Sequence, residues 1–217
     1  MLCYKNGALA REQVRDKHAE GSWQTFNTLV ESTPAGNDGL LGFYFPLPEI
    51  IPPNVHGNFF FSKTGVAQPE SAVPHSVHPR AILESQFLSI RSRIAAILPA
   101  HAPQLQRLVV CGGSSANTVI RQLAADAFGM RVYVAGQQGA AEGGAHLARF
   151  ARWRHENGGR GTFEELQAMD GEEDEGEERL RLVAEPDQKH VELYQGLIEK
   201  YRQCEDDVVR MCEKANV

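Results

Sequence analysis

Hydrophobic side chains recur three and four residues apart in several parts of the chain, which is the spacing of an amphipathic helix. One helix is predicted from about Gly7, and a second begins at Trp23 with Ser22 as its N-cap. The longest regular stripe follows Pro79, a residue type favoured in the first turn of a helix. Residues 187–217 carry another apolar stripe, so we expect them to form an amphipathic helix that packs on the rest of the protein.

Short apolar runs between these helices predict strands. The runs LLGFYF and NVHGNFFFSK are bounded by turn residues, and so are RLVVC and RVYVAG farther along the chain. Between the last two runs lies the segment GGSSA, followed by a helical pattern that ends at Gly129. A strand, a helix and a second strand in this order are typical of parallel pairing, in which a helix forms the crossover. The pattern therefore predicts an α/β fold with parallel strands.

Acidic residues concentrate in one short segment. Residues 172–178 read EEDEGEE, and their six carboxylates account for the whole net charge of −6. We expect residues 156–186 to form a disordered or solvated linker, with a functional acidic tail as the alternative. The sequence has no basic patch with interleaved aromatic residues, so no nucleic acid partner is expected.

The composition, with 42% hydrophobic and 23% charged residues, is ordinary for a soluble globular protein. No apolar run approaches the ~20 residues of a membrane helix, and the first residues do not resemble a signal peptide. A cytoplasmic protein without a membrane partner is expected. The four cysteines form no CxxC pair, and His75 and His78 stand among prolines, where a solvent loop is expected instead of a metal site.

The segment after the third apolar run offers the main candidate chemistry. The first N–H groups of a helix point outward at its positive end, and Gly112 and Gly113 would let a ligand approach the backbone. A phosphate or the polar edge of a nucleotide would fit there, although a glycine-rich turn made only for packing is the alternative. The segment is neither a P-loop nor GxGxxG. Glu49, between prolines, is expected to be a surface or capping carboxylate.

Three stretches together resemble the C-terminal domain of FGGY-family carbohydrate kinases. CGGSSANTVIRQLAADAFGMRVYV is similar to that family's adenosine-binding turn, helix and strand, and QQGAAEGGAHLA is similar to its small-residue helix. GLLGFYFPLPEIIPP leads through GNFFF to the long helix, as in the family's signature region. Within the family, the eukaryotic and particularly the fungal xylulose kinases are most similar. The resemblance covers about residues 1–155 and the terminal helix.

The resemblance implies a ribonuclease H-like, actin-like ATPase lobe over residues 1–155, with ATP and Mg²⁺ as cofactors. Gly112 and Gly113 would bring backbone against the nucleotide, and Asn117 would lie at the adenosine. Trp23 matches a tryptophan that lines the nucleotide site in xylulose kinases. From the residues alone, Trp23 is equally compatible with a role as a core anchor.

The sequence also departs from the family pattern. The chain begins inside the C-terminal lobe, so we expect a lobe truncated at its N-terminal side, without the catalytic base, the pentulose pocket or most of the Mg²⁺ site. No catalytic or metal-binding residue is assigned, and a fragment of an ATP-dependent xylulose kinase, inactive alone, is expected. The alternatives are a non-catalytic module that binds a nucleotide or a protein partner, and an incomplete gene model.

Overall fold

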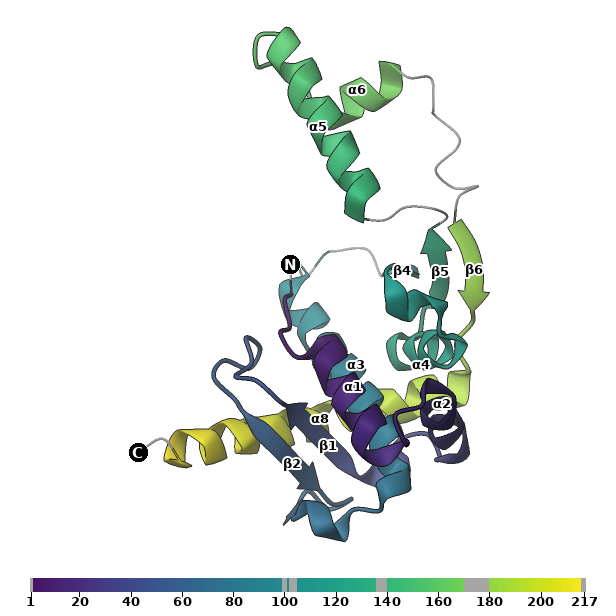
Figure 1. The fold of residues 1–217 in the computed structure, drawn as a ribbon, viewed down its shortest axis with the longest axis vertical. Helices are drawn as coiled ribbons and strands as arrows, with labels where there is room; N and C mark the ends of the chain where they lie inside the picture. The colour runs from purple at the N-terminus through teal and green to yellow at the C-terminus, as the bar shows by residue number, and fades with distance from the viewer. Residues whose placement is uncertain (1, 99–100, 102–104, 136–139, 170–179, 216–217) are drawn as a thin grey trace.

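The computed structural model describes residues 2–98, 101, 105–135, 140–169 and 180–215 (Figure 1). The α-helices are α1 (Gly7–His18), α2 (Trp23–Ser32), α3 (His78–Ile97), α4 (Thr118–Phe128), α5 (Ala140–Glu156), α6 (Phe163–Met169) and α8 (Gln188–Ala215). The strands are β1 (Leu41–Phe45), β2 (Gly57–Phe61), β3 (Ala67–Gln68), β4 (Arg107–Val110), β5 (Arg131–Ala135) and β6 (Leu180–Ala184). Short 3₁₀ turns are η1 (Asn37–Gly39), η2 (Glu70–Ala72), η3 (His75–Val77) and η4 (Gly113–Ala116).

The strands form two separate three-stranded sheets. In the first sheet, β1, β2 and β3 pair antiparallel in chain order, with Leu41 opposite Phe61. In the second, β4 and β5 are parallel and β6 joins β5 antiparallel. The predicted strand–helix–strand unit with parallel strands is therefore confirmed. Gly129 ends its helix with a φ of 65°, a conformation that glycine adopts without steric cost.

Helix α3 lies at the centre of the molecule and contacts α1, α4, α8 and β1 (Figure 1). The apolar stripe of α8 adds its side chains to the core that α3 and the first sheet form. Its fully buried members include Tyr194 and Tyr201, and the ring of Tyr201 lies 5.0 Å from that of Phe43 in β1. Aromatic packing thus joins the end of the chain to the first sheet.

Part of the expected linker has regular structure. Within residues 156–186, helix α6 packs on α5 through Phe163 and Phe150, whose rings are 5.4 Å apart. Strand β6 completes the second sheet, because its backbone pairs with the open edge of β5. The expectation of a structureless linker is wrong for these two elements, whereas the acidic run at 172–178 lies outside the described residues.

Two polar residues are more buried than the sequence suggests. His78, expected in a solvent loop, is the first residue of α3 and is only 1% exposed. Glu49 is also buried, and its carboxylate accepts N–H bonds from the backbones of Lys5, Asn6 and Ile50 at 2.6–3.1 Å. Burial alone would raise the pKa of Glu49, but these bonds outweigh it and lower that pKa. Glu49 therefore acts as a buried capping carboxylate that anchors the chain before α1.

No helix within the described ranges combines the length and the apolar character needed to cross a membrane.

Candidate functional site

One cavity of about 380 Å³ brings together three of the four residues that the sequence analysis assigns to a nucleotide. Trp23 enters it from the start of α2, Gly113 from η4 and Asn117 from the residue before α4. The remaining residues that line it are Ala8, Arg11, Glu12, Ser114 and Ile120. Segments distant in the sequence therefore converge on one hollow.

The two glycines of the turn have different roles. Gly112 does not line the cavity; it has a φ of 80°, which only glycine adopts without strain. Its carbonyl accepts bonds from the backbone N–H of Ser115 at 3.0 Å and from the hydroxyl of Ser115 at 2.7 Å. A Cβ added at Gly113 would meet no atom within 4 Å. Gly112 thus shapes the turn, and Gly113 leaves the cavity open beside the backbone.

Asn117 is the N-cap of α4, and both ends of its amide have partners. Its Oδ1 accepts the backbone N–H groups of Val119 and Ile120 at 3.0 and 3.1 Å. Its Nδ2 donates to Oδ1 of Asn27 in α2 at 2.8 Å. Asn117 therefore fixes the start of α4 and joins it to α2, and a ligand would have to share these amide atoms.

Trp23 is not a core anchor, since 38% of its surface is exposed. Its ring packs edge-on against Phe26, with ring centroids 5.3 Å apart. The guanidinium of Arg15 lies 4.8 Å from the ring centroid, within the range of a cation–π contact. These two neighbours hold the indole at the cavity while part of it stays accessible.

Arg11 is a site residue that sequence reasoning missed. Its guanidinium donates to the hydroxyl of Ser114 at 3.0 Å and to Oε1 of Gln86 at 2.7 Å. Both partners are uncharged, and burial lowers the pKa of Arg11. The sequence could have pointed to Arg11 only through its helical spacing, which places Ala8, Arg11 and Glu12 on one face of α1. Arg11 therefore places a partly buried positive charge at the cavity, and the carboxylate of Glu12, which also lines the cavity, offsets part of that charge.

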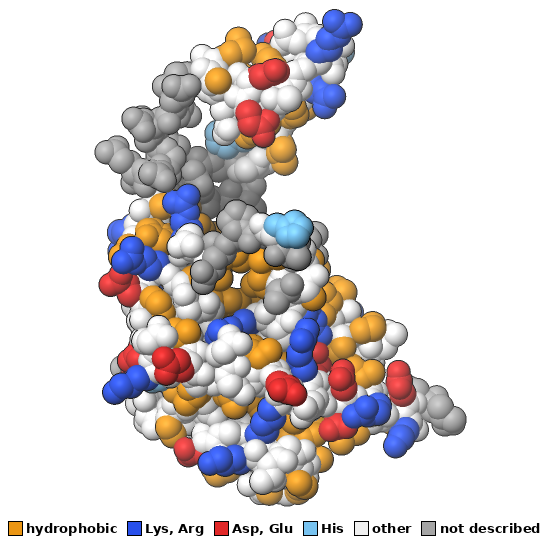
Figure 2. Space-filling view, turned by 180° about the vertical axis from the view of Figure 1, so that it is seen from behind, with side chains coloured by type: hydrophobic (Ala, Val, Ile, Leu, Met, Phe, Trp, Pro, Cys, Tyr) orange, Lys and Arg blue, Asp and Glu red, His pale blue; other side chains and the backbone are white. Residues whose placement is uncertain are grey.

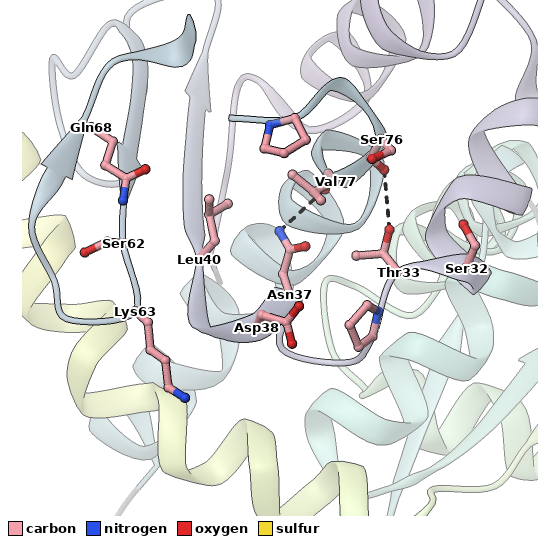
Figure 3. Close-up of a pocket in the computed structure, with 12 residues that line it drawn as sticks. Ser32, Thr33, Asn37, Asp38, Leu40, Ser62, Lys63, Gln68, Ser76 and Val77 are labelled. Carbon is pink, nitrogen blue, oxygen red and sulfur yellow. Dashed lines mark hydrogen bonds between the residues drawn. The ribbon is translucent and has the colours of Figure 1, made fainter. Parts of the chain in front are cut away.

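A second pocket, of about 390 Å³, lies between the end of α2, η1, β2 and η3 (Figure 3). Thr33 and Asn37 bond there to backbone carbonyls of η3, over 3.4 and 3.5 Å. Figure 3 shows Lys63 extending from the β2 side toward α8. None of the residues assigned to the nucleotide lines this pocket, so the first cavity is the candidate functional site.

A family model described as "FGGY family of carbohydrate kinases, C-terminal domain" matches residues 1–152. The chain belongs to this family. Among FGGY-family relatives, it is 40% identical over 134 residues to "Xylulose kinase" of Mus musculus, covering 62% of this chain and 24% of the mouse protein. It is 34% identical over 233 residues to "Probable D-xylulose kinase A" of Arthroderma otae, covering 94% of this chain and 39% of the fungal protein. The chain thus spans well under half the length of these relatives.

Solved structures support the same fold. A ligand-bound xylulose kinase from Lactobacillus acidophilus superposes with a TM-score of 0.71 at 18% identity, over 97% of this chain and 40% of that protein. A xylulose kinase from Rhodospirillum rubrum superposes with a TM-score of 0.64 at 21% identity, over 95% of this chain and 38% of that protein. The FGGY-family chain therefore has the α/β, actin-like ATPase fold of these kinases and corresponds to part of their length.

Proposed function

We propose that the cavity between α1, α2 and η4 binds the nucleotide of an ATP-dependent carbohydrate kinase. The observation that carries this proposal is the convergence of Trp23, Gly113 and Asn117 on one hollow. The names of the relatives favour D-xylulose as the sugar that the complete enzyme phosphorylates. The chain supplies the nucleotide half of that reaction.

The cavity offers each part of a nucleotide a suitable group. The accessible part of Trp23 provides an aromatic surface for a base. The open backbone at Gly113 and the first turn of α4 suit a polar or anionic group. Arg11 adds a guanidinium, the side chain best matched to phosphate oxygens. ATP therefore fits the residues present.

The residues that line the cavity do not form a suitable site for Mg²⁺. Mg²⁺ requires near-octahedral oxygen ligands, usually from one or two carboxylates, water and the phosphates of the substrate. Of the described residues that line the cavity, Glu12 alone carries a carboxylate. We therefore assign no Mg²⁺ ligand to this chain and derive no step through the ion.

Nucleotide binding is tested by titrating ADP and ATP while following the fluorescence of Trp23. The chain has two tryptophans, so a Trp153→Phe background isolates the signal. Gly113→Val fills the open space and should weaken binding by at least about tenfold, or about 1.4 kcal/mol. Gly143→Val in α5 is the matched control, because a Cβ there also meets nothing within 4 Å. No nucleotide response, or equal weakening by both valines, would refute the site.

The role of Arg11 is separable from that of the base-binding surface. Arg11→Gln should weaken binding of ADP and ATP more than binding of adenosine, because only the phosphates need a cation. Arg152→Gln is the control, since Arg152 lies on α5 and pairs with Glu156 at 2.9 Å. Equal losses for adenosine and ADP would show that Arg11 only maintains the shape of the cavity.

We further propose that this chain alone does not transfer phosphate to the sugar. General-base catalysis requires a group within hydrogen-bond reach of the attacking hydroxyl, and the relatives contain a long part that this chain does not match. A coupled assay of ATP consumption with D-xylulose should show no turnover above the enzyme-free control. Sustained turnover would contradict this part of the proposal and leave the binding site untouched.

A further inference from the structure

Three histidines meet where α1 ends and α3 begins. His18 is the last residue of α1, His75 belongs to η3 and His78 opens α3. The rings of His18 and His78 stack with centroids 3.8 Å apart and an angle of 14°. Glu70 of η2 approaches the same cluster, with its Oε1 lying 3.7 Å from Nε2 of His18. One candidate ligand atom each from His18, Glu70 and His78 lies within 4.8 Å of the other two.

The two stacked histidines are withdrawn from solvent. His78 is 1% exposed, and the side chain of His18 is 3% exposed. The in-plane lone pairs of two nearly parallel rings do not converge, so the ring of His18 must turn out of the stack before both histidines can ligate one ion.

The other nitrogen of each ring already has a partner. Nδ1 of His78 lies 2.9 Å from the hydroxyl of Tyr44, and Nδ1 of His18 lies 2.9 Å from Nδ1 of His75. Metal-bound histidines are usually oriented by such a hydrogen bond on the second ring nitrogen. This arrangement leaves Nε2 of His18 directed toward Glu70.

We propose that His18, Glu70 and His78 form a binding site for a divalent transition-metal ion of the zinc type. Two imidazoles and one carboxylate are a donor set that suits Zn²⁺ or Co²⁺ with water in the fourth position. The ligands come from α1, η2 and α3. A bound ion would tie the end of α1 to the start of α3, and this effect does not depend on the nucleotide cavity.

Two groups compete with the ion. The ammonium of Lys17 lies 2.6 Å from Oε1 of Glu70, and the backbone of Val73 forms a hydrogen bond with His78. An ion must displace Lys17 or use the other carboxylate oxygen, and its charge is repelled by the ammonium. Removing the lysine charge should therefore tighten metal binding. If the cluster served only as a hydrogen-bond network, removing the Lys17 charge would not tighten metal binding.

The test titrates Co²⁺ and Zn²⁺ into the purified chain. Co²⁺ should give the visible absorption bands of a tetrahedral complex, and Zn²⁺ should raise the unfolding temperature by mass action. Glu70→Gln should abolish both responses, and Lys17→Gln should shift the Co²⁺ titration to lower metal concentration. His56→Asn, at an exposed histidine elsewhere, is the control that should leave both responses unchanged.

Glu70 is only partly buried, so its substitution should leave the fold intact even if variants of the buried His18 or His78 do not fold. Two results would overturn the site. One is the absence of tetrahedral Co²⁺ bands in the unsubstituted chain. The other is a metal response that persists in Glu70→Gln or is lost in His56→Asn.

Discussion

The two three-stranded sheets of this protein differ in how completely other elements cover them. Every residue of β1 in the first sheet is buried, whereas no residue of β4 in the second sheet is. Phe43 of β1 is fully buried, while Val109 of β4 is 45% exposed. The second sheet is buried mainly through β5, whose Val132 joins the core with α4. Strand β1 of the first sheet thus lies inside the core, whereas β4 of the second sheet borders it.

Part of the surface near the second sheet is apolar. Figure 2 shows hydrophobic side chains around the hollowed middle of the molecule. Exposed large hydrophobic residues in and near the second sheet and α5 include Leu105, Val109, Leu147 and Leu182. Regions with few buried apolar contacts open at a lower free energy than a packed core. We therefore expect the second sheet to respond weakly to substitutions that would be severe in the first.

The largest expected effect is that of Phe43→Ala. Truncating a fully buried phenylalanine removes its packing and leaves a cavity, which costs about 3–5 kcal/mol of the free energy of unfolding. Val109→Ala, the paired change in the second sheet, should cost less than about 0.5 kcal/mol because Val109 is half exposed. Urea denaturation of both variants measures the difference. Similar losses would mean that the two sheets are equally buried in solution.

A smaller effect is expected from Tyr194→Phe. The hydroxyl of Tyr194 in α8 donates to the buried carboxylate of Glu84 at 2.8 Å and accepts from Arg80 at 3.1 Å. Removing it leaves Glu84 with one donor fewer, which costs about 1–3 kcal/mol. Tyr133→Phe in β5 is the matched control and should be nearly neutral in the same denaturation experiment. A neutral Tyr194→Phe would show that this hydroxyl adds nothing to the attachment of α8.

The same carboxylate predicts a pH dependence. Glu84 is 2% exposed and its Oε2 has no hydrogen-bond partner, so burial raises its pKa despite the lowering by Arg80. A carboxyl group with a raised folded-state pKa contributes stability below its unfolded pKa and loses it as the pH rises through the folded pKa. The free energy of unfolding of the unsubstituted protein, relative to that of Glu84→Gln, should therefore fall as the pH rises above the ordinary pKa of glutamate. If the free energy of unfolding relative to Glu84→Gln instead rose with pH, the raised pKa would be contradicted.

Local signals were sufficient to predict the strand–helix–strand unit. The apolar runs and the left-handed Gly129 each act within a few residues, so the sequence carries them directly. The same holds for Ser22, which accepts the N–H of Thr25 at 3.2 Å and starts α2 as predicted. Trp23, Gly113 and Asn117 share a cavity, but no single segment could show that they meet.

Features that depend on contacts distant in sequence were missed. Strand β6 follows an acidic run and has no buried residue, so only its pairing with β5 identifies it. His78 looked like part of a polar loop, yet stacking on His18 and bonding to Tyr44 bury it. Arg11 gains its role because η4 brings Ser114 to α1. In each case the decisive partner lies tens of residues away along the chain.

The smallest expected effect on stability comes from a substitution at the edge of the second sheet. Strand β4 pairs with β5 on one side, and no described strand pairs with its other side. An exposed edge can pair with another chain, and a lysine there discourages such pairing. Val109→Lys should change the free energy of unfolding by less than about 0.5 kcal/mol while reducing concentration-dependent self-association in sedimentation velocity.

Val66→Lys, at an exposed valine beside the two-residue β3, adds the same charge and should leave self-association unchanged. Equal reduction by both lysines would attribute the effect to net charge, and the edge of β4 would then have no special role.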